Sequence, residues 1–254
     1  MTMREPMTGA SGMVNARDLG GLRTPDGRQV RFRRVVRADS PTELDTAGLA
    51  HLLDEFGLRT VIDLRNVEEV AVDGCGELRE RVSRYRNLPV HGPDRQRLDL
   101  TAVSADGSML DRYLGYLEES PDTIVAALTE LADPEGTPAL VHCAAGKDRT
   151  GVVIALLLGV IGVGEEDIVA DYAETAVNSE LLRARIGRAR TVHARGGAVA
   201  TLPDWVFAAE ATTMRRFLDQ VSAEHGGIVA WATAAGLEPA VQQRLSEIML
   251  EPAA

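Results

Sequence analysis

A cysteine and an arginine separated by five residues are the side chains whose types and spacing could do chemistry together. Cys143 and Arg149 lie in the stretch HCAAGKDRTG, residues 142–151. A thiolate is a strong nucleophile, and a guanidinium presents a planar fork that binds two phosphate oxygens at once. Thr150 could donate its hydroxyl to the sulfur, and His142 could fix the loop by hydrogen bonds. These residue types predict attack on a phosphomonoester through a phosphocysteine.

The segments on either side of this stretch predict how it folds. Residues 138–141 are apolar and predict a buried strand, and residues 151–161 predict a helix. A loop between a strand and a helix N-terminus aims successive backbone N–H groups at one point, which attracts an anion and lowers the pKa of a thiol placed there. A glycine in the loop lets the backbone come close to the ligand. We therefore expect a thiolate at Cys143 and a phosphate site formed by Ala144, Ala145, Gly146 and Lys147.

Two other interpretations of the stretch are weaker. A lone buried cysteine often only packs, but here the thiol lies within loop chemistry that would activate it. A Walker-type nucleotide loop needs a glycine five residues before its Gly-Lys pair and a serine or threonine after the lysine. Gly146–Lys147 has neither. The stretch therefore favours thiol chemistry on phosphate.

The stretch resembles the phosphate-binding loop of the cysteine-dependent tyrosine phosphatase superfamily. The Lys147–Asp148 pair within it resembles the same part of the loop in a bacterial branch of that superfamily. That branch has broad tyrosine, serine/threonine and phosphoinositide activity. Shorter segments resemble other motifs of that branch in the same order: N-x-R-D-x-G-G at 15–21, an arginine-containing strand end at 36–39, D-L-R within 60–65 and D-Y at 171–172. The resemblance spans roughly residues 15–250, and it implies a cysteine-dependent phosphatase.

Strands alternate with helices along the chain, which predicts an α/β fold. We expect a mainly parallel central sheet flanked by helices, with a helical C-terminal region. Such a sheet places the site beyond the carboxyl end of its central strand. Residues 14–254 are expected to form a single phosphatase domain, and residues 1–13 are expected to be flexible. Within the domain, residues 179–250 either cover the site as a lid or pack on the core.

Local patterns also predict the individual elements. Outside the catalytic stretch, strands are expected over residues 29–36, 60–64 and 81–90. Helices are expected over residues 40–57, 110–119, 121–131 and 165–178. The residue pattern over 179–250 predicts further helices, and breaks between them are expected at positions that include Gly226–Gly227 and Gly236.

A carboxylic acid within reach of the leaving oxygen would complete the chemistry. Members of the superfamily often carry it on a W-P-D loop, which this sequence lacks. Residues 203–205 are the reversed P-D-W and predict a helix start. Asp94 follows a predicted strand end and enters a long irregular loop, so we expect it to be the acid. Asp99 and Asp106 are rivals in the same loop, and Asp148 lies inside the catalytic stretch.

Basic residues near predicted strand or loop ends could add positive potential for a phosphate dianion. Arg17 and Arg65 are candidates for substrate binding, although each could instead pair with a surface carboxylate. That second interpretation is favoured for Arg37. Lys147 is the sole lysine among the 27 lysine and arginine residues, and it would supply a compact point charge that an arginine fork does not replace.

Composition excludes several classes of protein. The 254 residues carry a net charge of −11, which argues against non-specific nucleic acid binding. No apolar run reaches membrane-spanning length, and residues 1–6 lack an apolar signal core. No metal-ligand pattern appears, so we expect no metal and no cofactor. Cys75 and Cys143 are the two cysteines, which favours a reducing, cytoplasmic setting.

These observations predict a phosphomonoester hydrolase whose partner is a phosphorylated substrate. A protein-tyrosine or dual-specificity phosphatase is the main expectation. The same loop would serve a phosphoinositide, an inositol phosphate, a nucleotide or a sugar phosphate, so a phosphatase of small metabolites is the alternative. A non-catalytic phosphate-binding module is weaker because a binder needs no nucleophile.

Overall fold

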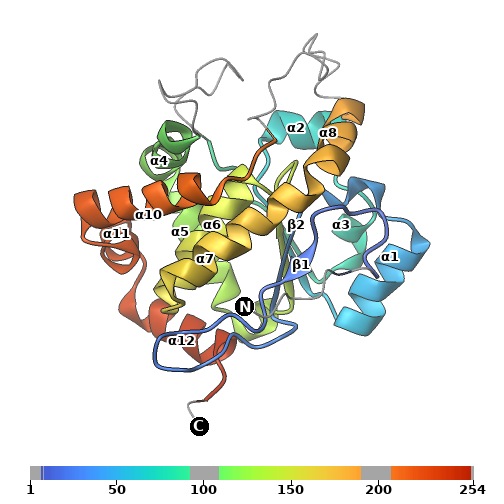
Figure 1. The fold of residues 1–254 in the computed structure, drawn as a ribbon. Helices are drawn as coiled ribbons and strands as arrows, with labels where there is room; N and C mark the ends of the chain where they lie inside the picture. The colour runs from blue at the N-terminus through green and yellow to red at the C-terminus, as the bar shows by residue number, and fades with distance from the viewer. Residues whose placement is uncertain (1–6, 8, 92–108, 190–206, 253–254) are drawn as a thin grey trace.

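A parallel sheet organises the fold. The computed structural model describes residues 7, 9–91, 109–189 and 207–252. Within these residues the strands form one sheet in the order β1-β2-β5-β3-β4 (Figure 1). Neighbouring strands are parallel except β1, which is antiparallel to β2. This confirms the predicted α/β fold, and the strand bounds are β1 Arg17–Asp18, β2 Val35–Ala38, β3 Thr60–Asp63, β4 Arg84–Asn87 and β5 Ala139–His142.

The three central strands end level with one another. Ala38 of β2 and Asp63 of β3 both pair with His142 of β5. Every residue of these three strands is buried, as expected for a parallel sheet covered on both faces. The residues that follow the strands therefore meet at one edge of the sheet, where Cys143 comes directly after β5.

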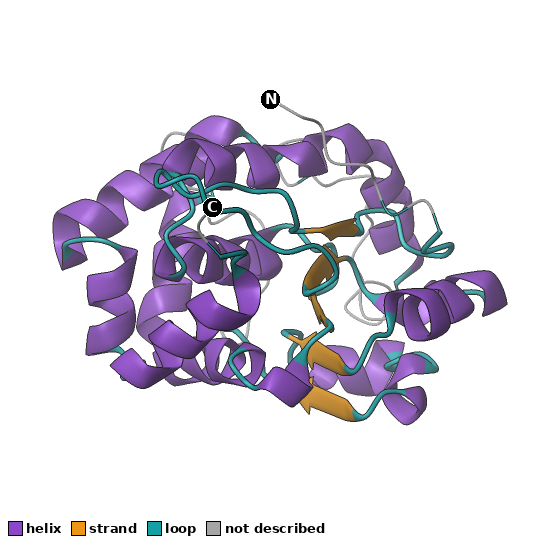
Figure 2. Cartoon of the chain, turned by 90° about the horizontal axis from the view of Figure 1, so that it is seen from below, coloured by secondary structure: helices purple, strands orange, loops and turns teal. Residues whose placement is uncertain are grey.

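Helices cover the two faces of the sheet unequally (Figure 2). The smaller layer contains α1 (Thr46–Ala50) and α3 (Leu78–Arg81). Two further helices, α2 (Val67–Asp73) and α8 (Ser179–Arg188), lie at the top of Figure 1, beyond the carboxyl ends of the strands. The larger layer contains α4 Leu110–Glu119, α5 Pro121–Leu131, α6 Asp148–Val160, α7 Glu165–Ala173, α10 Ala211–His225, α11 Ile228–Ala234 and α12 Pro239–Met249.

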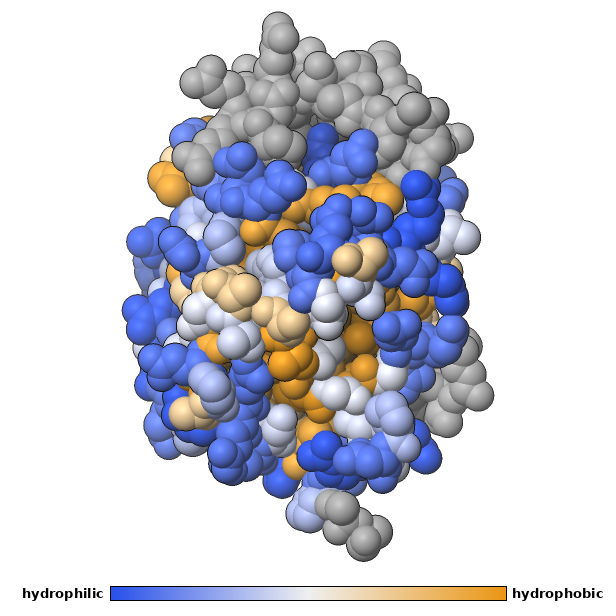
Figure 3. Space-filling view, turned by 90° about the vertical axis from the view of Figure 1, so that its left-hand side faces the viewer, coloured by the Kyte–Doolittle hydropathy of each residue, from blue (hydrophilic) through white to orange (hydrophobic). Residues whose placement is uncertain are grey.

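Helix α6 lies at the centre of the larger layer. Ten of its 13 residues are buried, which is typical of a helix that is apolar all round. By contrast, α10 is amphipathic and buries Met214, Phe217 and Val221. The face that carries α10 and α11 is mostly hydrophilic, with a band of hydrophobic side chains across its middle (Figure 3). The first turn of α6, and the loop of residues 143–147 before it, thus belong to a helix that is packed on several sides.

Several predicted elements are confirmed. The helices over 110–119 and 121–131 have the predicted bounds, and the strand over 60–64 is β3. The C-terminal helices break at the predicted glycines, because Gly226, Gly227 and Gly236 have φ angles of 78°, 109° and 100°. These left-handed values favour glycine.

The predicted strand over 29–36 and helix over 40–57 are wrong in extent. Arg33 has a left-handed φ of 61° and donates its N–H to Asp18, so the strand begins only at Val35. The predicted helix is divided into a 3₁₀ turn at Pro41–Glu43, helix α1 and a π-helical segment at His51–Phe56. Asp45 causes the division, since its carboxylate accepts the Gly48 N–H and caps α1.

Two further predictions need shorter bounds. The strand over 81–90 is limited to β4, because residues 78–81 fold as α3. The helix over 165–178 ends at Ala173, and Glu174–Asn178 continue as a 3₁₀ helix.

Candidate active site

The residues from Cys143 to Lys147 form a loop between β5 and α6. Cys143 is only 3% exposed and lies at the base of this loop. Gly146 has a φ of 67°, and a Cβ on it would lie 2.4 Å from the carbonyl carbon of Ala38. The loop therefore requires glycine here, because any side chain would collide with the end of β2.

Three consecutive carbonyl groups of this loop, those of residues 144–146, accept hydrogen bonds from outside it. The donors are the backbone N–H of Ser40, the side-chain amide of Asn15 and the guanidinium of Arg37, at 3.1, 3.0 and 2.8 Å in that order. Ser40 and Arg37 come from the end of β2, and Asn15 precedes β1. The conformation of the loop is thus set by the neighbouring strands.

Arg149 is held by a carboxylate of α2. Its Nη1 donates to Oε2 of Glu69 at 2.6 Å and its Nη2 to Oε1 at 2.9 Å. Glu69 is itself fixed, since its Oε2 accepts the backbone N–H of Asn66 at 2.8 Å. Burial opposes the charge of Arg149, but Glu69 outweighs this effect and raises the pKa of the guanidinium. Arg149 is therefore charged and oriented in the first turn of α6.

Two tyrosines from different helices are linked to Asp148. Tyr113 of α4 donates its hydroxyl to Oδ1 of Asp148 at 2.7 Å, and its oxygen lies 2.7 Å from the hydroxyl of Tyr172 on α7. Burial, and then the charge of Asp148, raises the pKa of both phenols. Both hydroxyls are therefore protonated at neutral pH, and they orient the Asp148 carboxyl group beside the loop.

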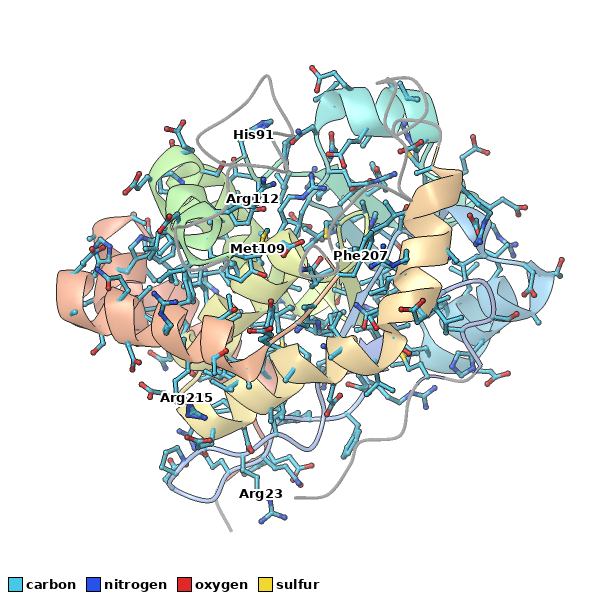
Figure 4. All side chains as sticks on the ribbon, turned by 45° about the horizontal axis from the view of Figure 1, so that its top comes forward. Arg23, His91, Met109, Arg112, Phe207 and Arg215 are labelled. Carbon is cyan, nitrogen blue, oxygen red and sulfur yellow. The ribbon has the colours of Figure 1, made fainter. Side chains whose placement is uncertain are left out.

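Lys147 is almost completely buried and connects two segments. Its Nζ donates to the carbonyl of Ala208 at 2.9 Å and lies 3.3 Å from Oδ1 of Asp148. Ala208 belongs to the segment that leads into α10. Figure 4 shows the neighbouring Phe207 beside α8 and Arg112 at the start of α4. The sole lysine of the chain thus joins the loop to the C-terminal helical region.

His142 is fully buried behind the loop. Its Nδ1 lies 3.1 Å from the carbonyl oxygen of Cys143, and its Nε2 lies 3.6 Å from Oδ2 of Asp63. Asp63 accepts hydrogen bonds from Arg65 and from the Tyr85 hydroxyl, both at 2.6 Å. Arg65 is therefore engaged in a buried ion pair. Burial lowers the pKa of His142 in spite of the nearby Asp63, so the ring is neutral at neutral pH.

The folded chain is expected to lose stability as the pH falls below 6.5. The pKa of His142 is lowered from 6.5 by burial, so the unfolded chain takes up this proton first and is favoured by acid. One such proton changes the free energy of unfolding by at most about 1.4 kcal/mol per pH unit. Urea unfolding at about pH 7.5 and 5.5 measures the change. The loss should be smaller in His142→Gln, whereas an equal loss would show that His142 is protonated as readily when folded.

Arg37 is not the surface arginine that its sequence context favoured. It is fully buried and donates to the Asp171 carboxylate and to the Gly146 carbonyl. Arg17 is also buried and contacts Asp171 Oδ1 at 3.2 Å and Asn15 Oδ1 at 2.8 Å. Because Arg17 is paired with Arg37 in the β1–β2 register, the two side chains reach the same carboxylate.

Other predicted site residues are placed differently or lie outside the structure. Within the described residues, Oγ1 of Thr150 is buried without a hydrogen-bond partner. The predicted bond from Thr150 to the Cys143 sulfur is therefore not formed here and stays a prediction. Asp94, Asp99 and Asp106 lie outside the described residues.

Some contributors were not assigned a role from the sequence. The spacing Asn66-x-x-Glu69 is the signature of a helix start in which the glutamate reaches back to the backbone, and it could have marked Glu69 as a fixed carboxylate. Asn15 and Asp171 belong to the N-x-R-D-x-G-G and D-Y motifs of the resemblance, but residue spacing gave neither of them a role, because their partners lie 130 and 154 residues away in the chain.

Among residues 7, 9–91, 109–189 and 207–252, no group of three or more His, Cys, Asp or Glu side chains is arranged to hold a metal ion. None of the helices in these ranges combines the length and apolar character needed to cross a membrane. Cys75 and Cys143 are both free thiols.

The chain is similar in sequence to a family model and to several known proteins. A model described as the tyrosine phosphatase family matches residues 8–251. The triple specificity protein phosphatase PtpB of Mycobacterium tuberculosis is 32% identical over 204 residues, which cover 69% of this chain and 71% of that protein. A tyrosine-protein phosphatase of Nostoc commune is 31% identical over 145 residues, 57% of this chain and 48% of that protein.

The chain spans only part of the length of these relatives. A relative from Cupriavidus necator is 32% identical over 168 residues, and the chain covers 60% of its length. Among solved structures, the core catalytic domain of the PP-IP phosphatase SIW14 from S. cerevisiae is 14% identical to this chain, with a TM-score of 0.37. The match includes 75% of this chain and 86% of the SIW14 chain.

Proposed function

The chain belongs to the tyrosine phosphatase family, and on that premise we propose that it hydrolyses phosphomonoesters through a phosphocysteine at Cys143. The observation that carries the proposal is the two-bond pair between Arg149 and Glu69 beside this thiol. A guanidinium has five N–H donors, so it can contact Glu69 and two phosphate oxygens together. A thiol at the same point would have no purpose in a site that only binds phosphate.

In the first proposed step, the Cys143 thiolate attacks phosphorus. An S–P bond forms, the P–O bond to the leaving group breaks, and the leaving oxygen takes a proton from a carboxylic acid. The loop amides, the α6 N-terminus and Arg149 hold the three equatorial oxygens. Because the transition state is loose and strongly charged, this fixed electrostatic environment supplies most of the rate.

In the second proposed step, water attacks the phosphorus of the phosphocysteine. The carboxylate formed in the first step takes a proton from the water, the S–P bond breaks, and inorganic phosphate leaves. The buried hydroxyl of Thr150 is proposed to donate to the departing sulfur. The thiolate is regenerated, and no metal ion is required for either step.

We propose Asp148 as the carboxylic acid, with Asp94 as the alternative from loop placement. The contacts of Asp148 support this proposal, since Tyr113 and Lys147 orient its carboxyl group beside the loop. Proton donation matters most when the leaving oxygen is strongly basic.

Asp148→Asn is expected to lower kcat by roughly a hundredfold or more on an alkyl phosphate. The loss should be much smaller on an activated aryl phosphate, because a good leaving group departs without a proton. Asp94→Asn, measured on the same two substrates, is the comparison. A leaving-group dependence in Asp94→Asn alone would move the assignment to Asp94.

Glu69→Gln is expected to lower kcat roughly tenfold or more, because the amide removes the counter-charge and one of the two acceptors that orient Arg149. Steady-state kinetics on an aryl phosphate measure the change. The adjacent, exposed Glu68 provides the matched control, and Glu68→Gln should leave kcat unchanged. An unaltered kcat in Glu69→Gln would show that Arg149 works without a fixed partner.

We propose phosphorylated proteins as the substrates, with tyrosine or dual specificity. The match to a relative named a triple specificity protein phosphatase supports this choice. The experiment compares kcat/KM on a phosphotyrosine peptide, a phosphoinositide and a nucleoside monophosphate, all with a chelator present. The highest value is expected for the peptide. A higher value for either small phosphate ester would favour a metabolite phosphatase, and phosphate binding without turnover would indicate a non-catalytic module.

The remaining expectations from the sequence are kept as proposals. Residues 14–254 are proposed to form one phosphatase domain whose C-terminal helices cover the site. The bond from Lys147 to Ala208, which joins the loop to that region, supports the proposal. A cytoplasmic setting is proposed from the two free thiols.

A further inference from the structure

The outward hydrogen bonds of the phosphate loop form a regular series. The carbonyl groups of residues 144, 145 and 146 each accept from one donor, and the donors come from three different residues: Ser40, Asn15 and Arg37. None of these donors belongs to the loop or to α6. Asn15 is 1% exposed and Arg37 is 0% exposed, so water does not compete for the two side-chain donors.

The geometry of the peptide group links the direction of these carbonyls to the direction of the N–H groups in the loop. In a trans peptide the carbonyl oxygen of one residue and the N–H of the next point in opposite directions. Drawing the three carbonyls outward therefore directs the N–H groups of Ala145, Gly146 and Lys147 to the other side. These are successive amides of the loop that starts at Cys143, so they point to the position of a phosphoryl group on the sulfur.

The same bonds also polarise these amides. A donor on a carbonyl oxygen makes the N–H of that peptide a stronger donor, because hydrogen bonds in a chain reinforce one another in a medium of low dielectric constant. The effect should be largest at the N–H of Lys147, because the carbonyl of the same peptide group, that of Gly146, accepts from the charged Arg37. Arg37, which is paired with Asp171, thus acts on the loop from the carbonyl side, opposite the N–H groups.

Asn15 and Arg37 are themselves fixed on their far sides. Asp171 accepts from Arg37 and from Arg17, and Arg17 donates in turn to Oδ1 of Asn15 at 2.8 Å. This contact settles the orientation of the amide group, because its oxygen faces a guanidinium and its NH₂ must face the Ala145 carbonyl. The two side chains can therefore present only donors to the loop.

We propose that Asn15 and Arg37 are positioning residues that preorganise the anion site of the loop by holding its carbonyl groups outward. The proposal rests on the proposed function for its role in turnover, but its core is a claim about phosphate affinity. That affinity can be measured without catalysis, in a chain whose nucleophile is replaced by Cys143→Ser.

The experiment measures the dissociation constant of inorganic phosphate by calorimetry in the Cys143→Ser chain, with and without Asn15→Ala. Loss of the Asn15 donor is expected to weaken phosphate binding about tenfold, because the freed carbonyl can turn toward the anion. In the chain with Cys143 intact, Asn15→Ala should lower kcat/KM by a similar factor.

Thr175→Val is the matched control for a merely structural effect. Thr175 Oγ1 accepts from Arg17 at 3.1 Å and is buried in the same network, two contacts further from the loop than Asn15. Thr175→Val should lower the melting temperature but change phosphate affinity less than about twofold. If Asn15→Ala does not fold, Asn15→Leu replaces it, since it keeps the volume of the side chain and removes the donor without adding a charge.

The outcomes separate this proposal from the proposed function. Equal phosphate affinity with and without the Asn15 substitution would overturn the proposal, and so would a Cys143→Ser chain that binds no phosphate. Equal losses of affinity in the Asn15 and Thr175 variants would also overturn it. A chain that hydrolyses no phosphomonoester, but loses phosphate affinity in the Asn15 variant alone, would refute only the proposed function.

Discussion

Cys143→Ser is expected to abolish turnover, with a fall in kcat of roughly four orders of magnitude or more. A serine hydroxyl is far less ionised than a thiol at neutral pH, so the attacking group is lost although its shape is retained. The loop amides and Arg149 are unchanged, and the variant should still bind inorganic phosphate. Release of phosphate from an aryl phosphate, followed with a chelator present, measures the effect.

The second cysteine supplies the control for this variant. Cys75 is a free thiol whose sulfur lies 3.3 Å from the Tyr85 hydroxyl and 3.5 Å from Arg79, and we assign it no part in the reaction. Cys75→Ser should keep kcat within about twofold of the wild type. Substantial turnover by Cys143→Ser would contradict the phosphocysteine mechanism, and so would activity that disappears on chelation alone.

Arg149→Lys is expected to lower kcat by about a hundredfold. Lysine keeps the positive charge but has a single nitrogen, so it cannot hold both oxygens of Glu69 and two phosphate oxygens at once. The loss should fall mainly on kcat, because the three oxygens adopt the equatorial arrangement that the guanidinium fork fits only in the transition state. Burst or single-turnover kinetics would identify which of the two chemical steps has slowed.

Arg84→Lys is the matched arginine control. Arg84 lies on β4 and pairs with Glu130 and Asp133, away from the loop, so Arg84→Lys should leave kcat unchanged. If Arg149→Lys retained the wild-type kcat, a point charge would suffice, and the paired geometry with Glu69 would have no role in catalysis.

Sequence alone predicted residues 142–151 as the proposed catalytic stretch and predicted the class of the fold. The residue types and the spacing of Cys143, Gly146 and Arg149 are local, because all three lie between the end of one strand and the first turn of one helix, and such a local pattern can be recognised from the sequence. The alternation of strands and helices likewise predicted the parallel sheet, and it placed the loop after a buried strand. The ends of elements were less certain, as at Val35, because turns such as that at Arg33 depend on contacts with other segments.

Tertiary structure alone decided which side chains support the loop. Arg149 and Glu69 are 80 residues apart, and Asn15 and Ala145 are 130 residues apart. The sequence marked Arg17, Arg37 and Arg65 as basic residues near strand ends, but it could not say whether they meet substrate or carboxylate. The physical reason is that a buried charge is stable only beside a partner, and the partner is chosen by the register of strands and the packing of helices, which residue spacing does not encode.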